Sequence, residues 1–272
     1  MTNLEIASQI RSLKLDLEAV LDSHGEAKMR FFVCRSDFRD DSGAPWFPAG
    51  FAPPAIPPGT DEELWNRTYD HVTCEVDALL TSYLAPALHL NNYLEWQAVD
   101  IEWDDVKHDL PEDAPRPSNI LRRATAGAYA MSILIAIKSA LDRFVRIFSL
   151  YYKGFAGHTT WGRYDKKGKA SGFMATVEQE RHMDPFFEHV HDAYHRWIKT
   201  AVAPRDQIIH YRDPKSVWNY ISETGGLIQS HSIQDADGEV FEFGPHSLHE
   251  YVTQWYTLAN QILLVLSTRI PK

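Results

Sequence analysis

The sequence predicts a mainly α-helical protein with four substantial helices, an N-terminal accessory helix and a small β-ribbon inserted before the last helix. Apolar residues recur at helical spacing along several long segments, whereas the period becomes that of strands between residues 217 and 243. The chain has 272 residues, 44% of them hydrophobic and 12% aromatic, which is enough to bury a sizeable core. We therefore expect residues 1–60 to form the accessory helix and a connector, and residues 61–272 to form a helical bundle with the ribbon at about 217–243.

The N-terminal segment carries apolar residues at helical spacing from Ile6 to Leu21, and His24-Gly25 then closes the pattern. This pattern predicts a single accessory helix. Residues 40–59 contain six prolines around Trp46 and Phe47, which indicates an irregular connector.

The four main helices are predicted over residues 61–98, 118–153, 184–211 and 246–268. Each has one apolar face that should point inward. In the first helix this face comprises Val72, Val76, Leu79, Leu80, Tyr83, Leu84, Ala87 and Leu88. In the second it comprises Ile120, Leu121, Met131, Leu134, Ile137, Leu141, Phe144, Val145, Phe148 and Tyr152. In the third helix it comprises Phe187, Val190, Tyr194, Trp197, Ile198 and Ala201. In the fourth it comprises Leu248, Tyr251, Val252, Trp255, Leu258, Ala259, Ile262, Leu263 and Leu266.

Capping and breaking residues set the bounds of these helices. Thr60 suits an N-cap position before a run of acids, and Asp184 with Pro185 suits the start of the third helix. Pro204 should break or kink the third helix and open a short helical piece that reaches Tyr211, and Asp213-Pro214 should end that piece.

Three short strands are predicted before the last helix, over Val217 to Ser222, Leu227 to Ile233 and Glu239 to Phe243. Thr-Gly-Gly and Asp-Ala-Asp-Gly separate them, and both are turn signals. These features indicate an antiparallel ribbon.

The formal net charge of -10 argues against a general nucleic-acid binder, since affinity for phosphate backbones comes chiefly from Lys and Arg. The charge is unevenly distributed along the chain. Residues 99–115, an expected loop, hold seven acids against one lysine, whereas residues 146–169 hold six cations against Asp165 alone. The basic stretch suits either a loop that faces RNA or a solvated surface loop.

The sequence also predicts a cytoplasmic protein that does not contact a membrane. No uninterrupted apolar run approaches the roughly 18 to 20 residues that a membrane helix needs. The N-terminus mixes acids and bases, unlike a signal peptide. Cys34 and Cys74 fit neither a disulfide framework nor a zinc pattern, so reduced thiols are expected.

The seven residues Arg205-Asp206-Gln207-Ile208-Ile209-His210-Tyr211 lie where the third helical pattern ends. An arginine is a permanent cation and a histidine titrates near neutral pH, so the pair suits phosphodiester chemistry. The motif resembles the signature of the HEPN superfamily, in which an arginine, often followed by Asn, Asp or His, precedes a histidine by a short spacer. In that family the motif lies near the end of the third helix of an antiparallel four-helix bundle, which is the fold that the resemblance implies here.

The resemblance implies a metal-independent endoribonuclease without a cofactor, whose composite active site forms where two motifs face each other in a homodimer. His210 would act as general base or acid on the ribose 2′-hydroxyl and the leaving oxygen, and Arg205 would bind the phosphate bidentately. Asp206 would orient one of these groups, Tyr211 would stack on a base or contact phosphate, and Arg212 would hold phosphate or pair with a neighbouring acid. A protein inhibitor, such as an antitoxin, is a further expected partner.

Helix geometry qualifies this hypothesis. Five residues correspond to about 140° around an α-helix, so Arg205 and His210 do not share one face. The long arginine side chain, a kink at Pro204 or the partner chain must bring the two groups together. An arginine and a histidine at a helix end can instead simply satisfy carbonyls and complement the helix dipole.

Two other functions are compatible with the sequence. A helical dimer that uses the motif only for binding would serve as an adaptor in a defence or toxin–antitoxin system. A metal site is the second alternative, because His191 and His195 are four residues apart on one helix. Its other candidates are His189, His246, His249 and Glu250. The apolar face should turn His191 and His195 towards the flank, so we expect no bound metal.

Asp142 interrupts the apolar face of the helix predicted over 118–153. An i,i+4 ion pair with Lys138 or Arg146 is the expected explanation, and a position lining the cleft is the alternative.

Overall fold

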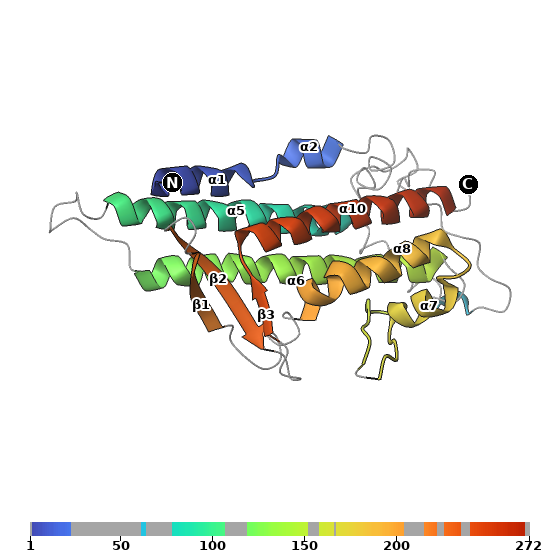
Figure 1. The fold of residues 1–272 in the computed structure, drawn as a ribbon. Helices are drawn as coiled ribbons and strands as arrows, with labels where there is room; N and C mark the ends of the chain where they lie inside the picture. The colour runs from blue at the N-terminus through green and yellow to red at the C-terminus, as the bar shows by residue number, and fades with distance from the viewer. Residues whose placement is uncertain are drawn as a thin grey trace, which may run out of the picture. The chain divides into compact units, whose positions relative to one another are not determined.

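The computed structural model describes residues 2–22, 61–63, 78–106, 119–151, 158–165, 167–203, 215–221, 226–234 and 240–269. Most of these residues are helical, and a three-stranded antiparallel sheet precedes the last helix in the chain (Figure 1). The prediction of a mainly helical protein with a small antiparallel ribbon is therefore confirmed. The connector at 40–59, Cys34 and Cys74 lie outside the described residues.

The bounds of the elements are α1 Asn3–Ser12, α2 Leu17–Asp22, α5 Leu79–Val106, α6 Asn119–Tyr151, α7 Phe173–Glu180, α8 Pro185–Ala193, the π-helix η1 Tyr194–Ile198, β1 Lys215–Ile221, β2 Gly226–Gln234, β3 Val240–Phe243 and α10 Pro245–Arg269. Residues 199–203 continue η1 as α-helix. The ranges predicted for α6, α10 and the three strands agree with these bounds to within two residues.

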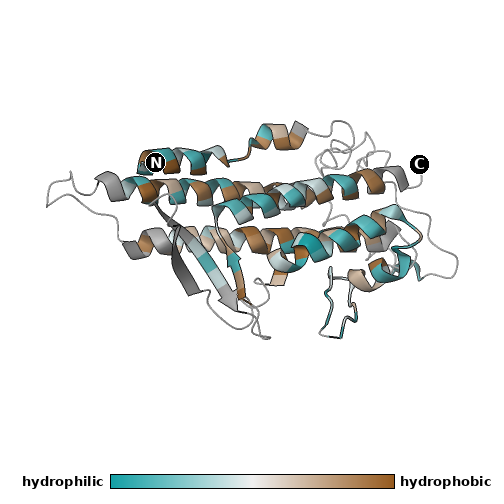
Figure 2. Ribbon diagram, viewed as in Figure 1, coloured by the Kyte–Doolittle hydropathy of each residue, from teal (hydrophilic) through white to brown (hydrophobic). Residues whose placement is uncertain are grey.

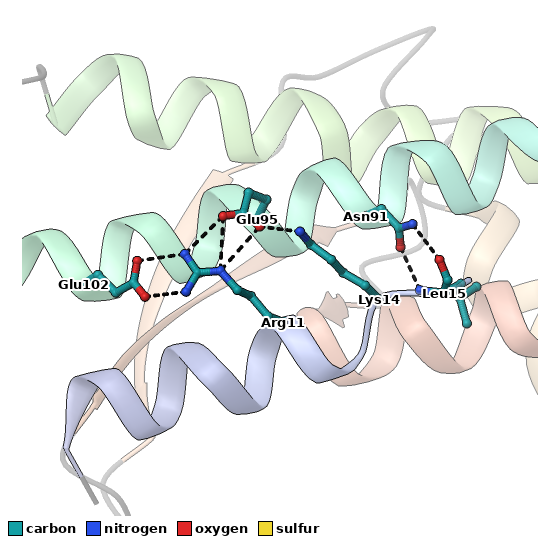
Figure 3. Close-up of polar contacts among 6 residues, drawn as sticks. All are labelled: Arg11, Lys14, Leu15, Asn91, Glu95 and Glu102. Carbon is teal, nitrogen blue, oxygen red and sulfur yellow. Dashed lines mark hydrogen bonds and ion pairs between the residues drawn. The ribbon is translucent and has the colours of Figure 1, made fainter. Parts of the chain in front are cut away.

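The N-terminal segment forms two helices, so the prediction of a single accessory helix is wrong. α1 begins with a capping box between Thr2 and Glu5, and the chain leaves helical geometry at residues 13–16. At the break, the side-chain amide of Asn91 accepts the backbone N–H of Leu15 and donates to its carbonyl, both at 2.8 Å (Figure 3). These two hydrogen bonds replace those that a continuous helix would supply.

Helix α5 differs from the helix predicted over 61–98. Residues 62 and 63 are helical, residues 64–77 lie outside the described part of the chain, and α5 continues to Val106. The residues from 99 to 106 are therefore helical, although the whole acidic stretch was expected to be a loop. Ile101 extends the buried face of Leu94 and Ala98 by one turn, which explains why the helix continues.

Where burial is described, the buried faces of the helices largely follow the predicted apolar stripes, and Figure 2 shows hydrophobic and hydrophilic residues interspersed along the same helices. Of the predicted stripe residues, Val72, Val76 and Tyr152 and the side chains of Leu80, Ile120 and Leu266 lie outside the described part of the structure. Leu88 and Leu121 are exceptions, since they are 44% and 61% exposed. Leu88 lies about 100° around the helix from buried Ala87, and Leu121 lies five residues before Ala126, which is buried.

One stretch of the described residues, Ala124–Phe148 in α6, is long and apolar enough to cross a membrane by length and composition. Its Ile133, Leu134 and Ile137 are fully buried against other parts of the protein. A core helix passes the same test, so this stretch is weak evidence for a membrane span.

The chain divides into two compact units, and α5, α6 and α10 contribute residues to both. The first unit comprises Met1–Leu17, Leu84–Ile137 and Trp197–Gln254. Within it, α1 lies along α5, as Figures 1 and 3 show, and buries Ile6, Ala7 and Ile10. The sheet of this unit has the order β1-β2-β3.

The second unit comprises Glu18–Tyr83, Lys138–Arg196 and Trp255–Lys272. Its core is rich in aromatic contacts. Phe173 of α7 stacks on Phe148 of α6 with ring centroids 5.6 Å apart, and it contacts Trp161 at 4.9 Å. The hydroxyl of Tyr256 donates to the carbonyl of Tyr83 at 2.9 Å and so joins α10 to the start of α5.

Candidate functional site

The five residues of the predicted site, Arg205, Asp206, His210, Tyr211 and Arg212, lie outside the described residues. The helix before them is described to Ala203, and β1 begins at Lys215. The motif thus belongs to the stretch of chain between the penultimate long helical segment and the sheet.

The helix that leads to the motif contains the π-helix η1. An i→i+5 turn adds one residue relative to an α-helix, which rotates the following residues by about 100°. Tyr194, Trp197 and Ile198 remain buried, as predicted. The helix that leads to the motif thus departs at Tyr194 from the α-helical period that begins at Pro185.

A polar cluster in the second unit joins the loop at 158–172 to α7 and to the helix of α8 and η1. We call it the Tyr164 cluster, and its members are Tyr164, Glu178, Arg181, His191 and His195. The Tyr164 hydroxyl donates to Glu178 Oε2 at 2.7 Å, and Glu178 pairs with Arg181 at 3.0 Å. Arg181 Nη1 lies 2.8 Å from His191 Nε2, and the rings of His191 and His195 are 4.6 Å apart.

The protonation of this cluster follows from burial and charge. Burial raises the pKa of the Tyr164 phenol, and the hydrogen bond to the Glu178 carboxylate raises it further. The phenol therefore stays a hydrogen-bond donor at neutral pH. As Arg181 can only donate, His191 Nε2 accepts its hydrogen bond, and the lone pair of that nitrogen is occupied.

Three of the histidines proposed for the metal alternative are either hydrogen-bonded to another group or exposed. His249 Nδ1 donates to the Leu13 carbonyl at 2.7 Å, and His195 and His246 are exposed. Within the described part of the chain, no group of three His, Cys, Asp or Glu residues is placed to hold a metal ion. The Tyr164 cluster is best explained as a network that fixes the loop on the two helices.

Asp142 forms the expected i,i+4 ion pair with Lys138. Its Oδ1 also accepts the backbone N–H of Trp161 at 2.7 Å, and its Oδ2 lies 2.6 Å from Lys138 Nζ. Both carboxylate oxygens are therefore engaged, which favours a structural role for Asp142 over a position lining a cleft.

Sequence reasoning missed several of these residues. Glu178 of α7 and Arg181 at its C-cap are three residues apart, a spacing typical of an ion pair, but their connection to Tyr164 depends on the folded loop. His231 of β2 was also missed, although it shares strand parity with Leu227 and Ile233, an apolar pattern that signals a buried position.

No family model, no curated protein and no solved structure matches this chain. The function is therefore inferred from the chemistry of the chain's own residues.

Proposed function

We propose that the protein is a metal-independent endoribonuclease of the HEPN type that acts as a homodimer, with Arg205 and His210 as its catalytic pair. The observation that carries this proposal is a guanidinium and an imidazole five residues apart, directly after a helical segment. The order of elements supports it, since α5, α6 and the helix from Pro185 precede the motif and α10 follows it. An antiparallel four-helix bundle of these segments is part of the same proposal.

In the proposed reaction, the ribose 2′-oxygen attacks the adjacent phosphorus and the bond to the 5′-oxygen breaks. His210 accepts the proton of the 2′-hydroxyl or donates one to the departing 5′-oxygen, and two facing copies would serve both steps. Arg205 donates parallel hydrogen bonds to phosphate oxygens whose negative charge grows in the transition state. The products carry a 2′,3′-cyclic phosphate and a 5′-hydroxyl.

The remaining motif residues have supporting roles in this proposal. Asp206 orients Arg205 or His210, Tyr211 stacks on a base or contacts phosphate, and Arg212 holds phosphate. All of these groups are supplied by the protein, so the reaction requires no metal ion.

The basic loop at 158–172 supports RNA as the substrate class. Asp165 Oδ1 accepts the backbone N–H groups of Lys167 and Lys169, each at 2.8 Å, and this turn holds the shape of the loop. Arg163, Lys167 and Lys169 are all exposed. These exposed cations can attract the phosphate backbone of RNA independently of its sequence, although the net charge of the whole chain is negative.

Cleavage of single-stranded RNA in excess chelator tests the proposal. We expect the wild-type protein to cut RNA and to leave 2′,3′-cyclic phosphate ends. His210→Ala should lose roughly 100-fold or more of the rate, since general acid–base catalysis contributes at least that much. Arg205→Lys should also be impaired, because an ammonium cannot bind phosphate bidentately.

His246→Ala is the matched control, because His246 is exposed on α10 and lies outside the motif. It should cut RNA at the wild-type rate, and every variant should keep the dimer mass by light scattering. Equal rates for wild type and His210→Ala, or loss of wild-type cleavage in chelator, would contradict the proposal. A stable dimer that does not cut RNA would instead favour the non-catalytic adaptor.

A further inference from the structure

His231 of β2 is a fully buried histidine in the first unit. Its side chain is 0% exposed, and neither ring nitrogen has a hydrogen-bond partner within the described residues. The ring stacks on Phe243 of β3 with centroids 5.6 Å apart and planes at 24°, and the Tyr93 ring of α5 lies 6.2 Å away. On a third side, a Cβ built on Gly127 of α6 would stand 3.5 Å from His231 Cε1. The imidazole therefore fills the space between the sheet and the two helices.

An imidazole is an unfavourable choice for this space on packing grounds alone. A neutral imidazole has one N–H donor and one acceptor nitrogen, and leaving both unpaired in a buried position is destabilising. A phenyl ring would make the same stacking contact with Phe243 without unpaired polar atoms. The property that a phenyl ring lacks is the ability to take up a proton near neutral pH.

Among the residues that the structure describes, no group compensates a positive charge on His231. α5 presents Tyr93, a phenol that hydrogen-bonds Gln97 and whose own pKa is raised by burial, and it is therefore neutral. α6 presents Gly127 and β3 presents Phe243, neither of which is ionisable. Burial alone lowers the pKa of His231 to about 4, without a contribution from a charged neighbour in the described residues.

We propose that His231 is a pH-sensitive switch: its neutral ring holds the sheet against α5 and α6, and its protonation releases the sheet. An imidazolium must regain water, and it can do so only by leaving the space between Phe243 and Tyr93. Since His231 lies within β2, the strand must move with the ring. The switch does not depend on the proposed ribonuclease activity.

The direction of the effect follows from proton binding. In the released state His231 has the ordinary pKa of 6.5, whereas in the closed state its pKa is about 4. The released state binds more protons between these two values, so its population rises as the pH falls through this window. From pH 7 to pH 5 the opening equilibrium should increase by roughly 20-fold.

Hydrogen–deuterium exchange of β2 at pH 7 and pH 5, corrected for intrinsic exchange rates, measures this opening. We expect the roughly 20-fold increase in the wild-type protein and less than about a threefold increase in His231→Phe. His89→Phe is the matched control, because burial also lowers the pKa of His89, which contacts Tyr129 of α6 in the same unit. It should keep most of the wild-type increase.

A wild-type sheet that does not open at pH 5, or a His231→Phe sheet that opens as much as the wild type, overturns the proposal. If His231→Phe does not fold, an NMR titration of the wild-type histidine Cε1–H resonances tests the switch instead. The switch requires the His231 ring to remain neutral at pH 5.5 in molecules whose β2 amides are protected. A ring that titrates near 6.5 while β2 stays protected overturns it.

Discussion

The carboxylate of Asp142 in α6 accepts the backbone N–H of Trp161 at 2.7 Å and pairs at the same time with Lys138, which is 6% exposed. Trp161 is itself fully buried against Phe173 of α7. One acid therefore neutralises a buried cation and positions the largest apolar side chain of the 158–172 loop.

Asp142→Ala is expected to destabilise the protein by about 3 kcal/mol, because it leaves the Lys138 ammonium and the backbone N–H of Trp161 without their partner. Urea unfolding measures this loss. Lys138→Met in the same chain should recover part of it, since the double variant no longer buries an unpaired charge. A loss below about 1 kcal/mol for Asp142→Ala, or no recovery in the double variant, would show that water reaches this site.

Arg11 of α1 is bound by Glu95 and Glu102 of α5, and Lys14 also pairs with Glu95 (Figure 3). The groups are about one-third exposed, so Arg11→Met should cost only about 1 kcal/mol in urea unfolding at pH 6. The hydrogen bonds of Lys14 and then Arg11 lower the pKa of Glu95, and that of Arg11 lowers the pKa of Glu102.

The stabilisation from these two carboxylates is present above their ordinary pKa of 4.5 and is lost as the pH falls through their lowered values. The stability difference between wild type and Arg11→Met should therefore shrink as the pH falls below 4.5. Urea unfolding curves at a series of pH values test this, and a difference that stays constant down to pH 3 would contradict it.

Gly127→Ala should stabilise the protein by about 0.5 to 1 kcal/mol, because alanine is the better residue in a helix interior. The added methyl group would meet His231 Cε1 at 3.5 Å, an ordinary contact distance, so no neighbour has to move. Thermal unfolding measures the gain. A fall in melting temperature would mean that the His231 ring lies closer to α6 than the structure shows.

Gly162→Ala and Gly168→Ala form a matched pair in the 158–172 loop. Both glycines have positive φ, at +83° and +76°. A Cβ at Gly162 would stand 1.8 Å from the Ser171 carbonyl oxygen, whereas a Cβ at Gly168 would meet nothing within 4 Å. Gly168→Ala should therefore cost only the backbone strain of about 1 to 2 kcal/mol, and Gly162→Ala clearly more. Urea unfolding compares the two, and equal losses would contradict the close approach at Gly162.

The long, strongly periodic segments were predictable from the sequence. α6 and α10 each carry an apolar stripe over many turns, so their bounds and buried faces follow from local spacing. The three strands follow from the change of period and from the turn residues between them. The site at Arg205 and His210 was inferred from a local motif, and it stays a prediction because those residues lie outside the described part of the chain.

Other features required partners far away in the sequence. The break after α1 depends on Asn91, and the extension of α5 to Val106 accompanies the burial of Ile101 and the pairing of Glu102 with Arg11. The π-helix at Tyr194–Ile198 has no signature in the local apolar period.

The sequence by itself determined the bounds of α6, α10 and the three strands and most of the buried faces of the described helices, because periodicity and turn residues act over a few positions. Only the tertiary structure decided where a helix breaks, which acids neutralise Arg11 and Lys138, and that His231 is buried without a hydrogen-bond partner among the described residues. The physical reason is that desolvation and hydrogen-bond satisfaction depend on what surrounds a side chain in space, and those neighbours lie on other elements.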